Sequence, residues 1–216
     1  MLDDTQEWVP EQGTPRGAAI SPLLSNIYLD PLDHPMAGWG FEMVRYADDF
    51  MVLCRDPREA ARALSVVRDW TEKSGLTLHP EKARLVDAAT GGFDFLGYRF
   101  ERGRRWPRKK SLAKLRDAIR AKTGRNVGKG VSMAIADIDP VLKGWCKYFR
   151  HSRRSTFRGV DGWVRRRLRS IPRRQRKMYC ISKTHGADHV RWPNVFFAEP
   201  GLFSLQEARD AVGQSS

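Results

Sequence analysis

Cysteine is scarce in this sequence, and the three that occur, Cys54, Cys146 and Cys180, are odd in number and far apart. This argues against a disulfide framework and a four-cysteine zinc site, and it favours a reducing, cytoplasmic environment. Long apolar runs are also missing, and the N-terminus lacks a basic region followed by an apolar stretch. We therefore expect no membrane-spanning helix, no signal peptide and no membrane partner.

Acidic residues are scarce in one part of the chain. Residues 101–178 hold 26 Lys/Arg against 5 Asp/Glu, whereas residues 1–100 hold 10 against 16 and residues 179–216 hold 3 against 4. The net charge of +14 therefore arises from the middle of the chain. A merely solvated charged face normally mixes both signs. Because Trp and Tyr are interleaved with these bases, we expect this segment to bind the phosphate backbone of a nucleic acid.

Two adjacent carboxylates, Asp48 and Asp49, stand between two apolar runs that are rich in aromatic and β-branched residues. Such flanks predict strands, and Asp tolerates tight turns, so we expect a hairpin with both acids at its tip. Adjacent carboxylates repel each other unless a cation lies between them, and oxygen-ligated Mg²⁺ is the usual solution. A solvated Asp-Asp turn is the alternative, and residues 44–53 taken alone favour it.

Several motifs follow one another along the chain. In order they are Gly13-Thr14-Pro15-Arg16-Gly17, Ile20-Ser21-Pro22-Leu23-Leu24-Ser25-Asn26-Ile27-Tyr28, Tyr46-Ala47-Asp48-Asp49, Leu78-His79-Pro80-Glu81-Lys82, Phe93-Asp94-Phe95-Leu96-Gly97-Tyr98, Lys143-Gly144-Trp145-Cys146-Lys147-Tyr148-Phe149-Arg150 and Arg191-Trp192-Pro193-Asn194. This series resembles the reverse transcriptase encoded within bacterial group II introns. The Lys143 motif resembles the core of that family's maturase, or thumb, domain. The resemblance covers nearly the whole chain.

The resemblance implies RNA-templated DNA synthesis with Mg²⁺, a role in intron splicing and mobility, and group II intron RNA with primer or target DNA as partners. It implies that Asp48 and Asp49 are catalytic metal ligands and that Lys82 lies near the leaving pyrophosphate. A solvated strand-edge lysine is an equally good interpretation of Lys82. The residues implied to bind substrate are Pro15, Arg16, Gly17, Tyr46 and Ala47, although the family usually has Gln at the position of Arg16.

One expected metal ligand has no counterpart. In the family, the first metal-binding Asp belongs to a strand well upstream of the Gly13 motif, and we find no equivalent in this sequence. We therefore expect the chain to be a truncated enzyme that is inactive alone in polymerisation but binds RNA. Two alternatives remain open: a non-catalytic RNA-binding splicing protein, and half of a polymerase that an N-terminal polymerase fragment completes in trans.

The expected fold class is α+β. Residues 1–104 would form a partial polymerase palm of antiparallel strands with covering helices, residues 105–178 a three-helix maturase-specific (thumb) domain, and residues 179–216 a C-terminal extension. In the palm, apolar spacing predicts a helix from residue 18 to 32 with one buried face, a second helix ended by Ser74-Gly75, a strand near residues 81–86 and a hairpin-like element over residues 93–100.

Three apolar stripes predict the helices of the second domain. They cover residues 112–119, residues 135–149 with an interruption at Asp139-Pro140, and residues 160–171 with an end at Pro172. Trp145 and Trp163 fall on these stripes, which favours a place in the core. The bases around Trp106 predict a phosphate-binding linker. The predicted RNA-binding residues are Arg104, Arg105, Arg108, Lys109, Lys110, Lys143, Lys147, Arg150, Arg153, Arg154, Arg165, Arg166 and Arg167.

Overall fold

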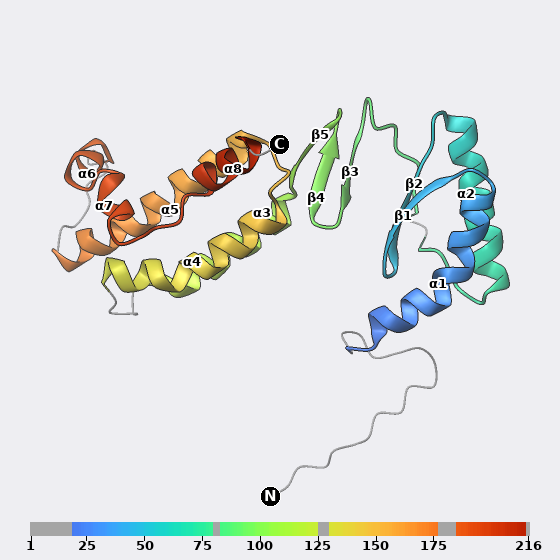
Figure 1. Cartoon of the computed structure of the whole chain (residues 1–216), viewed down its shortest axis with the longest axis horizontal. Helices are drawn as coiled ribbons and strands as arrows, with labels where there is room; N and C mark the ends of the chain where they lie inside the picture. Colours follow the sequence, from blue (N-terminus) through green and yellow to red (C-terminus); the bar gives the residue numbers. More distant parts are fainter. Residues whose placement is uncertain (1–18, 80–82, 125–129, 177–184, 215–216) are drawn as a thin grey trace, which may run out of the picture. The chain divides into compact units, whose positions relative to one another are not determined.

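The computed structural model describes residues 19–79, 83–124, 130–176 and 185–214. The chain divides into two compact units, residues 1–87 and 88–216, which we call the first and the second unit and describe separately (Figure 1). Helices and small antiparallel sheets occur together, which confirms the expected α+β class. Within the described ranges, no helix combines the length and the apolar character needed to cross a bilayer.

The first unit places a two-stranded hairpin between two helices. Its elements are α1 (Ser21–Gly38), β1 (Glu42–Tyr46), β2 (Asp49–Leu53) and α2 (Pro57–Lys73). The start of α2 follows from its sequence: the Asp56 side chain accepts a hydrogen bond from the Glu59 amide at 2.8 Å, and Pro57 occupies the first turn. A small apolar core joins α1, α2 and the hairpin through Leu32, Met36, Phe41, Ala63 and Val67.

The predicted buried face of α1 is wrong. Ile20, Leu23 and Ile27 are 54%, 56% and 63% exposed. The helix continues beyond residue 32 to Gly38, and its second half supplies the buried Leu32 and Met36. Apolar spacing identifies the face that could be buried, but only a packed neighbour buries it. Within the described residues, the apolar core lies against the C-terminal half of α1.

The second unit begins with a three-stranded antiparallel sheet in the order β3-β4-β5. The strands are β3 (Gly92–Phe95), β4 (Tyr98–Glu101) and β5 (Arg104–Pro107). The described residues 83–88 form no strand, so the strand expected near 81–86 is not found there. The predicted linker around Trp106 is also wrong, because Arg104 to Pro107 pair with β4.

Two tyrosines explain why this sheet belongs to the helical unit. The Tyr98 hydroxyl donates to the Tyr148 carbonyl at 2.6 Å, and the Tyr148 hydroxyl donates to the Leu96 carbonyl at 2.8 Å. Burial raises the pKa of Tyr98, so this hydroxyl stays a donor to a still higher pH than an exposed tyrosine. The sheet therefore lies in the second compact unit, which begins at residue 88. The domain bounds at residues 104 and 178 stay a prediction.

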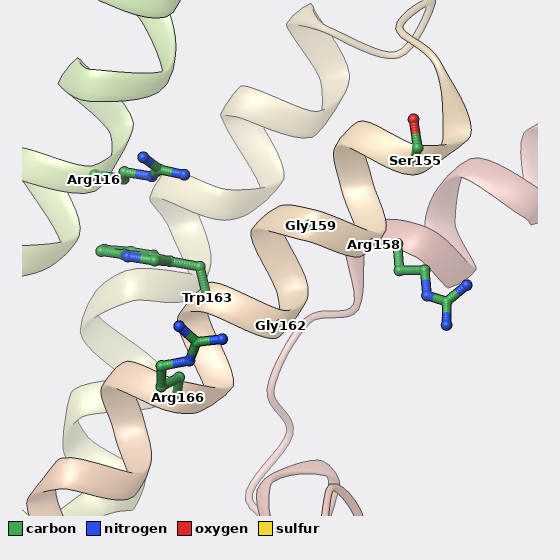
Figure 2. Close-up of a pocket in the computed structure, with 7 residues that line it drawn as sticks. All are labelled: Arg116, Ser155, Arg158, Gly159, Gly162, Trp163 and Arg166. Atoms are coloured by element: carbon green, nitrogen blue, oxygen red, sulfur yellow. The ribbon is translucent and has the colours of Figure 1, made fainter. Parts of the chain in front are cut away.

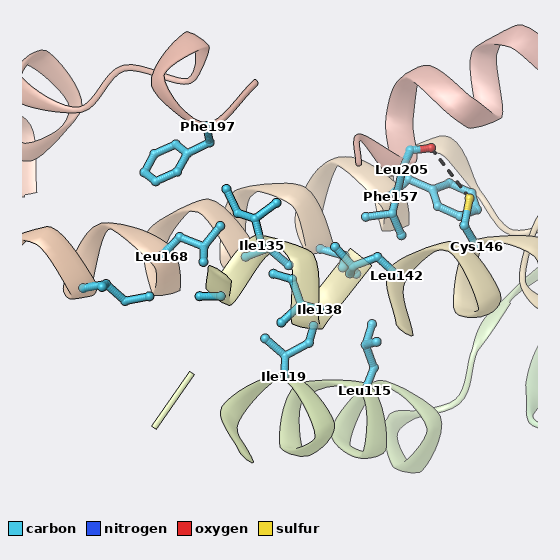
Figure 3. Close-up of a cluster of buried hydrophobic side chains, with 14 of the residues drawn as sticks. Leu115, Ile119, Ile135, Ile138, Leu142, Cys146, Phe157, Leu168, Phe197 and Leu205 are labelled. Atoms are coloured by element: carbon cyan, nitrogen blue, oxygen red, sulfur yellow. Dashed lines mark hydrogen bonds between the residues drawn. The ribbon is translucent and has the colours of Figure 1, made fainter. Parts of the chain in front are cut away.

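Helices make up the rest of the second unit. They are α3 (Lys109–Lys122), α4 (Val131–Tyr148), α5 (Arg154–Gln175), α6 (His185–Arg191), α7 (Val195–Ala198) and α8 (Leu205–Gln214). Figure 3 shows how side chains from α3, α4 and α5 meet, with Leu115 and Ile119 facing Ile138 and Leu142. Phe197 and Leu205 from the C-terminal segment join the same buried cluster, so this segment packs onto the three predicted helices.

Two proline predictions are wrong. Pro140 lies inside α4 without interrupting it, and α5 continues through Pro172 to Gln175. A proline within a helix removes one backbone hydrogen bond and costs about 3 kcal/mol. Burial of Ile138 and Leu142 around Pro140, and of Leu168 and Ile171 before Pro172, offsets that cost.

Candidate nucleic-acid interface

The hairpin tip carries the two adjacent acids, as the sequence predicted. β1 and β2 pair from Glu42 opposite Leu53 to Tyr46 opposite Asp49, which leaves Ala47 and Asp48 as the turn. Asp48 and Asp49 are both exposed. Ala47 has φ 52°, a left-handed conformation that costs a residue with a side chain about 1 kcal/mol or more. The tip is therefore held in a strained shape.

Arg45 fixes that shape. Its guanidinium forms an ion pair with Asp33 of α1, in which Nε lies 2.9 Å from Oδ1. It also donates to the Asn26 side chain at 2.9 Å and to the Ala47 carbonyl at 3.1 Å. The side-chain hydrogen bond with Asp33 raises the pKa of Arg45 against the opposing effect of burial. Sequence reasoning missed this arginine, since its partner stands twelve residues earlier on another element.

The tip fits a two-metal site only in part. Metal-assisted phosphoryl transfer needs carboxylates from more than one element to hold two ions. Asp48 and Asp49 are adjacent, and in the described ranges no cluster of three or more His, Cys, Asp or Glu could share an ion. These residues alone do not make a complete Mg²⁺ site. Pro15, Arg16, Gly17 and Lys82, the other predicted substrate and catalytic residues, lie outside the described part of the chain.

A basic cluster forms where β5 meets the connection between α4 and α5. We define it by Arg105, Arg150 and Arg153. The Arg105 side chain donates to the His151 carbonyl at 3.2 Å, and the Arg153 guanidinium lies over the Trp106 ring at 5.3 Å. Loss of hydration, together with the charges of Arg105, Arg150 and Arg209, lowers the pKa of His151. The structure thus gathers three predicted RNA-binding residues into one positive region.

Other predicted RNA-binding residues carry structural contacts. Arg167 donates to the Thr123 hydroxyl and carbonyl at 3.0 and 3.1 Å, at the end of α3. Arg154 forms an ion pair with Asp210 at 2.6 Å. Two predicted RNA-binding residues, Arg108 and Arg165, are half-buried, and the Lys143 ammonium lies 3.8 Å from the Asp139 carboxylate. Five others are exposed, namely Arg104, Lys109, Lys110, Lys147 and Arg166. Their roles in binding stay predictions.

Sequence reasoning missed a pocket between α3 and α5. Arg116, Arg158, Gly159, Gly162 and Trp163 line it, together with Ser155 and Arg166. Trp163 lies where the pocket meets the core: it is partly buried and packs against the buried cluster, as its place on an apolar stripe predicted. The available signal was the pair of helix-interior glycines beside the tryptophan, because Gly is costly within a helix.

Comparison with known protein families supports both the acidic hairpin and the helical part of the second unit. The family model for reverse transcriptase (RNA-dependent DNA polymerase) matches residues 2–100. The model for the group II intron, maturase-specific domain matches residues 112–187. No curated protein matches the chain. The first match contains the hairpin with its paired acids, and the second contains α4, α5 and all but the first three residues of α3.

Proposed function

This chain belongs to the group II intron reverse transcriptase/maturase family, and we propose that its second unit binds folded group II intron RNA through the basic cluster. One observation carries the proposal: within the described residues, none of Arg105, Arg150 and Arg153 is paired with a carboxylate. Each therefore keeps its charge for a partner. Phosphate contacts of this kind supply most of the affinity of RNA for a protein and position it on the protein surface.

The backbone that carries the basic cluster supports the same proposal. The cluster joins β5 to the start of α5, and the Arg153 amide donates to the Arg105 carbonyl at 3.3 Å. Arg105 and Arg153 therefore stand on paired backbone, and Arg150 lies in the short connection between α4 and α5. Preorganised donors lose less conformational entropy on binding, so this region suits a fixed feature of folded RNA better than a disordered strand.

Binding of RNA should depend steeply on salt. Each engaged phosphate contributes about 0.7 to the log–log slope on single strands and about 0.9 on a duplex. We expect Arg153→Gln to weaken binding and to lower this slope by roughly one contact, since the substitution removes an unpaired charge. The measurement is the dissociation constant for a folded group II intron RNA at several KCl concentrations.

Arg154→Gln is the matched control, because it removes the neighbouring charge, which Asp210 already pairs. We expect it to lower the slope less than Arg153→Gln does, because the charge that it removes is already paired. Salt-independent binding by the unmodified chain would contradict the proposal, and equal slopes for Arg153→Gln and the unmodified chain would remove Arg153 from the interface.

For the hairpin tip we propose a supporting role: Asp48 and Asp49 form part of a larger Mg²⁺ ligand set. Since no third His, Cys, Asp or Glu joins these two carboxylates among the described residues, we expect no primer extension on an RNA template by the 216-residue chain alone in Mg²⁺. Extension that Asp48→Asn abolishes would contradict this expectation and would mean that residues outside the described ranges complete the site.

A further inference from the structure

The pocket between α3 and α5 has a shape and charge that the proposed function has not used. It is an open depression of about 540 Å³, a volume within the range of sites that hold small organic ligands. Figure 2 shows Trp163 on the side of α5 that faces α3, which contributes Arg116, whereas the Arg158 side chain extends to the other side of α5. We call it the α3–α5 pocket.

The charge of this pocket is uncompensated. Arg116, Arg158 and Arg166 line it, and no carboxylate does. Among the described residues, none of these guanidinium groups forms an ion pair, whereas Arg120 on the same α3 helix pairs with Asp117 at 2.7 Å. Like charges in one depression repel each other and raise the local positive potential. The pocket is therefore complementary to an anion, and guanidinium groups suit phosphate oxygens.

The floor of the pocket is open helix backbone. Gly159 and Gly162 lie within α5, and a Cβ atom added at either would meet nothing within 4 Å. No packed neighbour therefore requires glycine at these positions. Each costs the helix about 0.5–1 kcal/mol relative to alanine. Two glycines at i and i+3 share one helix face, so their combined effect is to keep that face clear for a ligand.

One end of the pocket is aromatic. The indole of Trp163 is partly buried against the core, and the Arg116 and Arg120 guanidinium groups lie over its ring at 5.6 and 5.7 Å. Figure 2 shows the Arg116 guanidinium stacked above the indole at the edge of the pocket. Unpaired bases bind to proteins by stacking on aromatic rings and on arginine planes. An anionic site beside such a surface matches the two parts of a nucleotide.

We propose that the α3–α5 pocket holds one unpaired nucleotide of the bound nucleic acid. Arg158 and Arg166 contact its phosphates, and Trp163 with Arg116 stacks against its base. The inference rests on the proposed function, because it assigns a particular feature of the nucleic acid to the same unit. A bulged or looped-out nucleotide would thereby set the register of a folded RNA on the second unit.

The test fills the floor of the pocket. Gly162→Gln adds a neutral side chain where the structure has space, and glutamine favours helix more than glycine does, so the melting temperature should be equal or higher. Gly144→Gln is the matched control: Gly144 lies within α4, where an added Cβ also meets nothing within 4 Å, and it does not line the pocket. Dissociation constants are measured for an RNA hairpin with one bulged nucleotide and for the fully paired hairpin.

We expect the unmodified chain to prefer the bulged hairpin by roughly tenfold, which is typical of one stacked base. Gly162→Gln should lose this preference, and Gly144→Gln should keep it. The same pair of hairpins in DNA forms a second arm, in which a bulge preference would show that either nucleic acid can supply the nucleotide. Equal binding of both hairpins by the unmodified chain would overturn the inference, as would a bulge preference that survives Gly162→Gln. If the unmodified chain binds neither hairpin, the proposed function fails as well.

Discussion

Replacing Phe157 by alanine is expected to lower the free energy of unfolding of the second unit by about 3–5 kcal/mol. Phe157 is fully buried in the cluster that joins α3, α4, α5 and the C-terminal segment, and its ring meets Trp145 edge-on at 6.2 Å. The truncation removes apolar contacts and leaves a cavity that these helices fill only in part. Because a domain is typically stable by about 5–15 kcal/mol, the variant should retain little stability.

Urea unfolding followed by circular dichroism measures this loss. Met133→Ala on α4 is the control, since Met133 is 58% exposed and its truncation should change stability by no more than about 0.5 kcal/mol. RNA affinity of Phe157→Ala, measured where the variant is still folded, should match that of the unmodified chain. A loss of stability below about 1 kcal/mol would mean that α5 can repack around the gap.

Replacing Asp161 by alanine is expected to detach α8 and to lower the free energy of unfolding by about 3 kcal/mol. This carboxylate on α5 is 4% exposed and accepts hydrogen bonds from the Leu205 and Gln206 amides, both at 3.1 Å, and from the Ser204 hydroxyl at 3.3 Å. It thus caps the first turn of α8 from another helix. Alanine would leave these donors unsatisfied at a buried position.

Asp117→Ala is the control for Asp161→Ala, because Asp117 is an exposed α3 carboxylate whose ion pair with Arg120 contributes at most about 1 kcal/mol. Urea unfolding at neutral pH compares the two variants. An effect of Asp161→Ala no larger than that of Asp117→Ala would contradict the capping role.

The pH dependence of Asp161 has a defined sign. Desolvation by burial raises the pKa of Asp161, and the Gln206 and Leu205 amides oppose the rise. When the pKa of a carboxyl is higher in the folded than in the unfolded chain, the carboxyl contributes most to folding stability below its unfolded pKa, which is about 3.8–3.9. That contribution falls as the pH rises through the folded pKa. As the pH rises from acidic values, the unmodified chain should therefore lose stability relative to Asp161→Asn.

The hairpin and its acidic tip could be predicted because their signals are local. Apolar runs flank the two acids, which predicted a hairpin with both at its tip. The register, in which Tyr46 pairs with Asp49 as the first residue of β2, came from the structure. The Asp33 contact of Arg45 could not be predicted in this way. It joins α1 to β1, and many carboxylates in the sequence could have been the partner.

The roles of individual arginines were also beyond the sequence. Arg153 and Arg154 are neighbours with the same charge, yet one stacks on Trp106 and the other pairs with Asp210. A charge count predicts that the segment carries excess positive charge. It cannot say which guanidinium groups are already paired with carboxylates or backbone carbonyls. That allocation depends on the docking of α8 and of β5 onto the helices.

The amino-acid sequence by itself determined the α+β class, the helical stripes of the second unit, the acidic turn and the positive segment. Each of these features depends only on composition or on residues that are close together in the chain. The tertiary structure alone decided which apolar faces are buried, that β5 is a strand of the helical unit, that helices continue through Pro140 and Pro172, and that α3 and α5 enclose a pocket. These features depend on contacts between residues far apart in the chain, whose packing energy outweighs local preference.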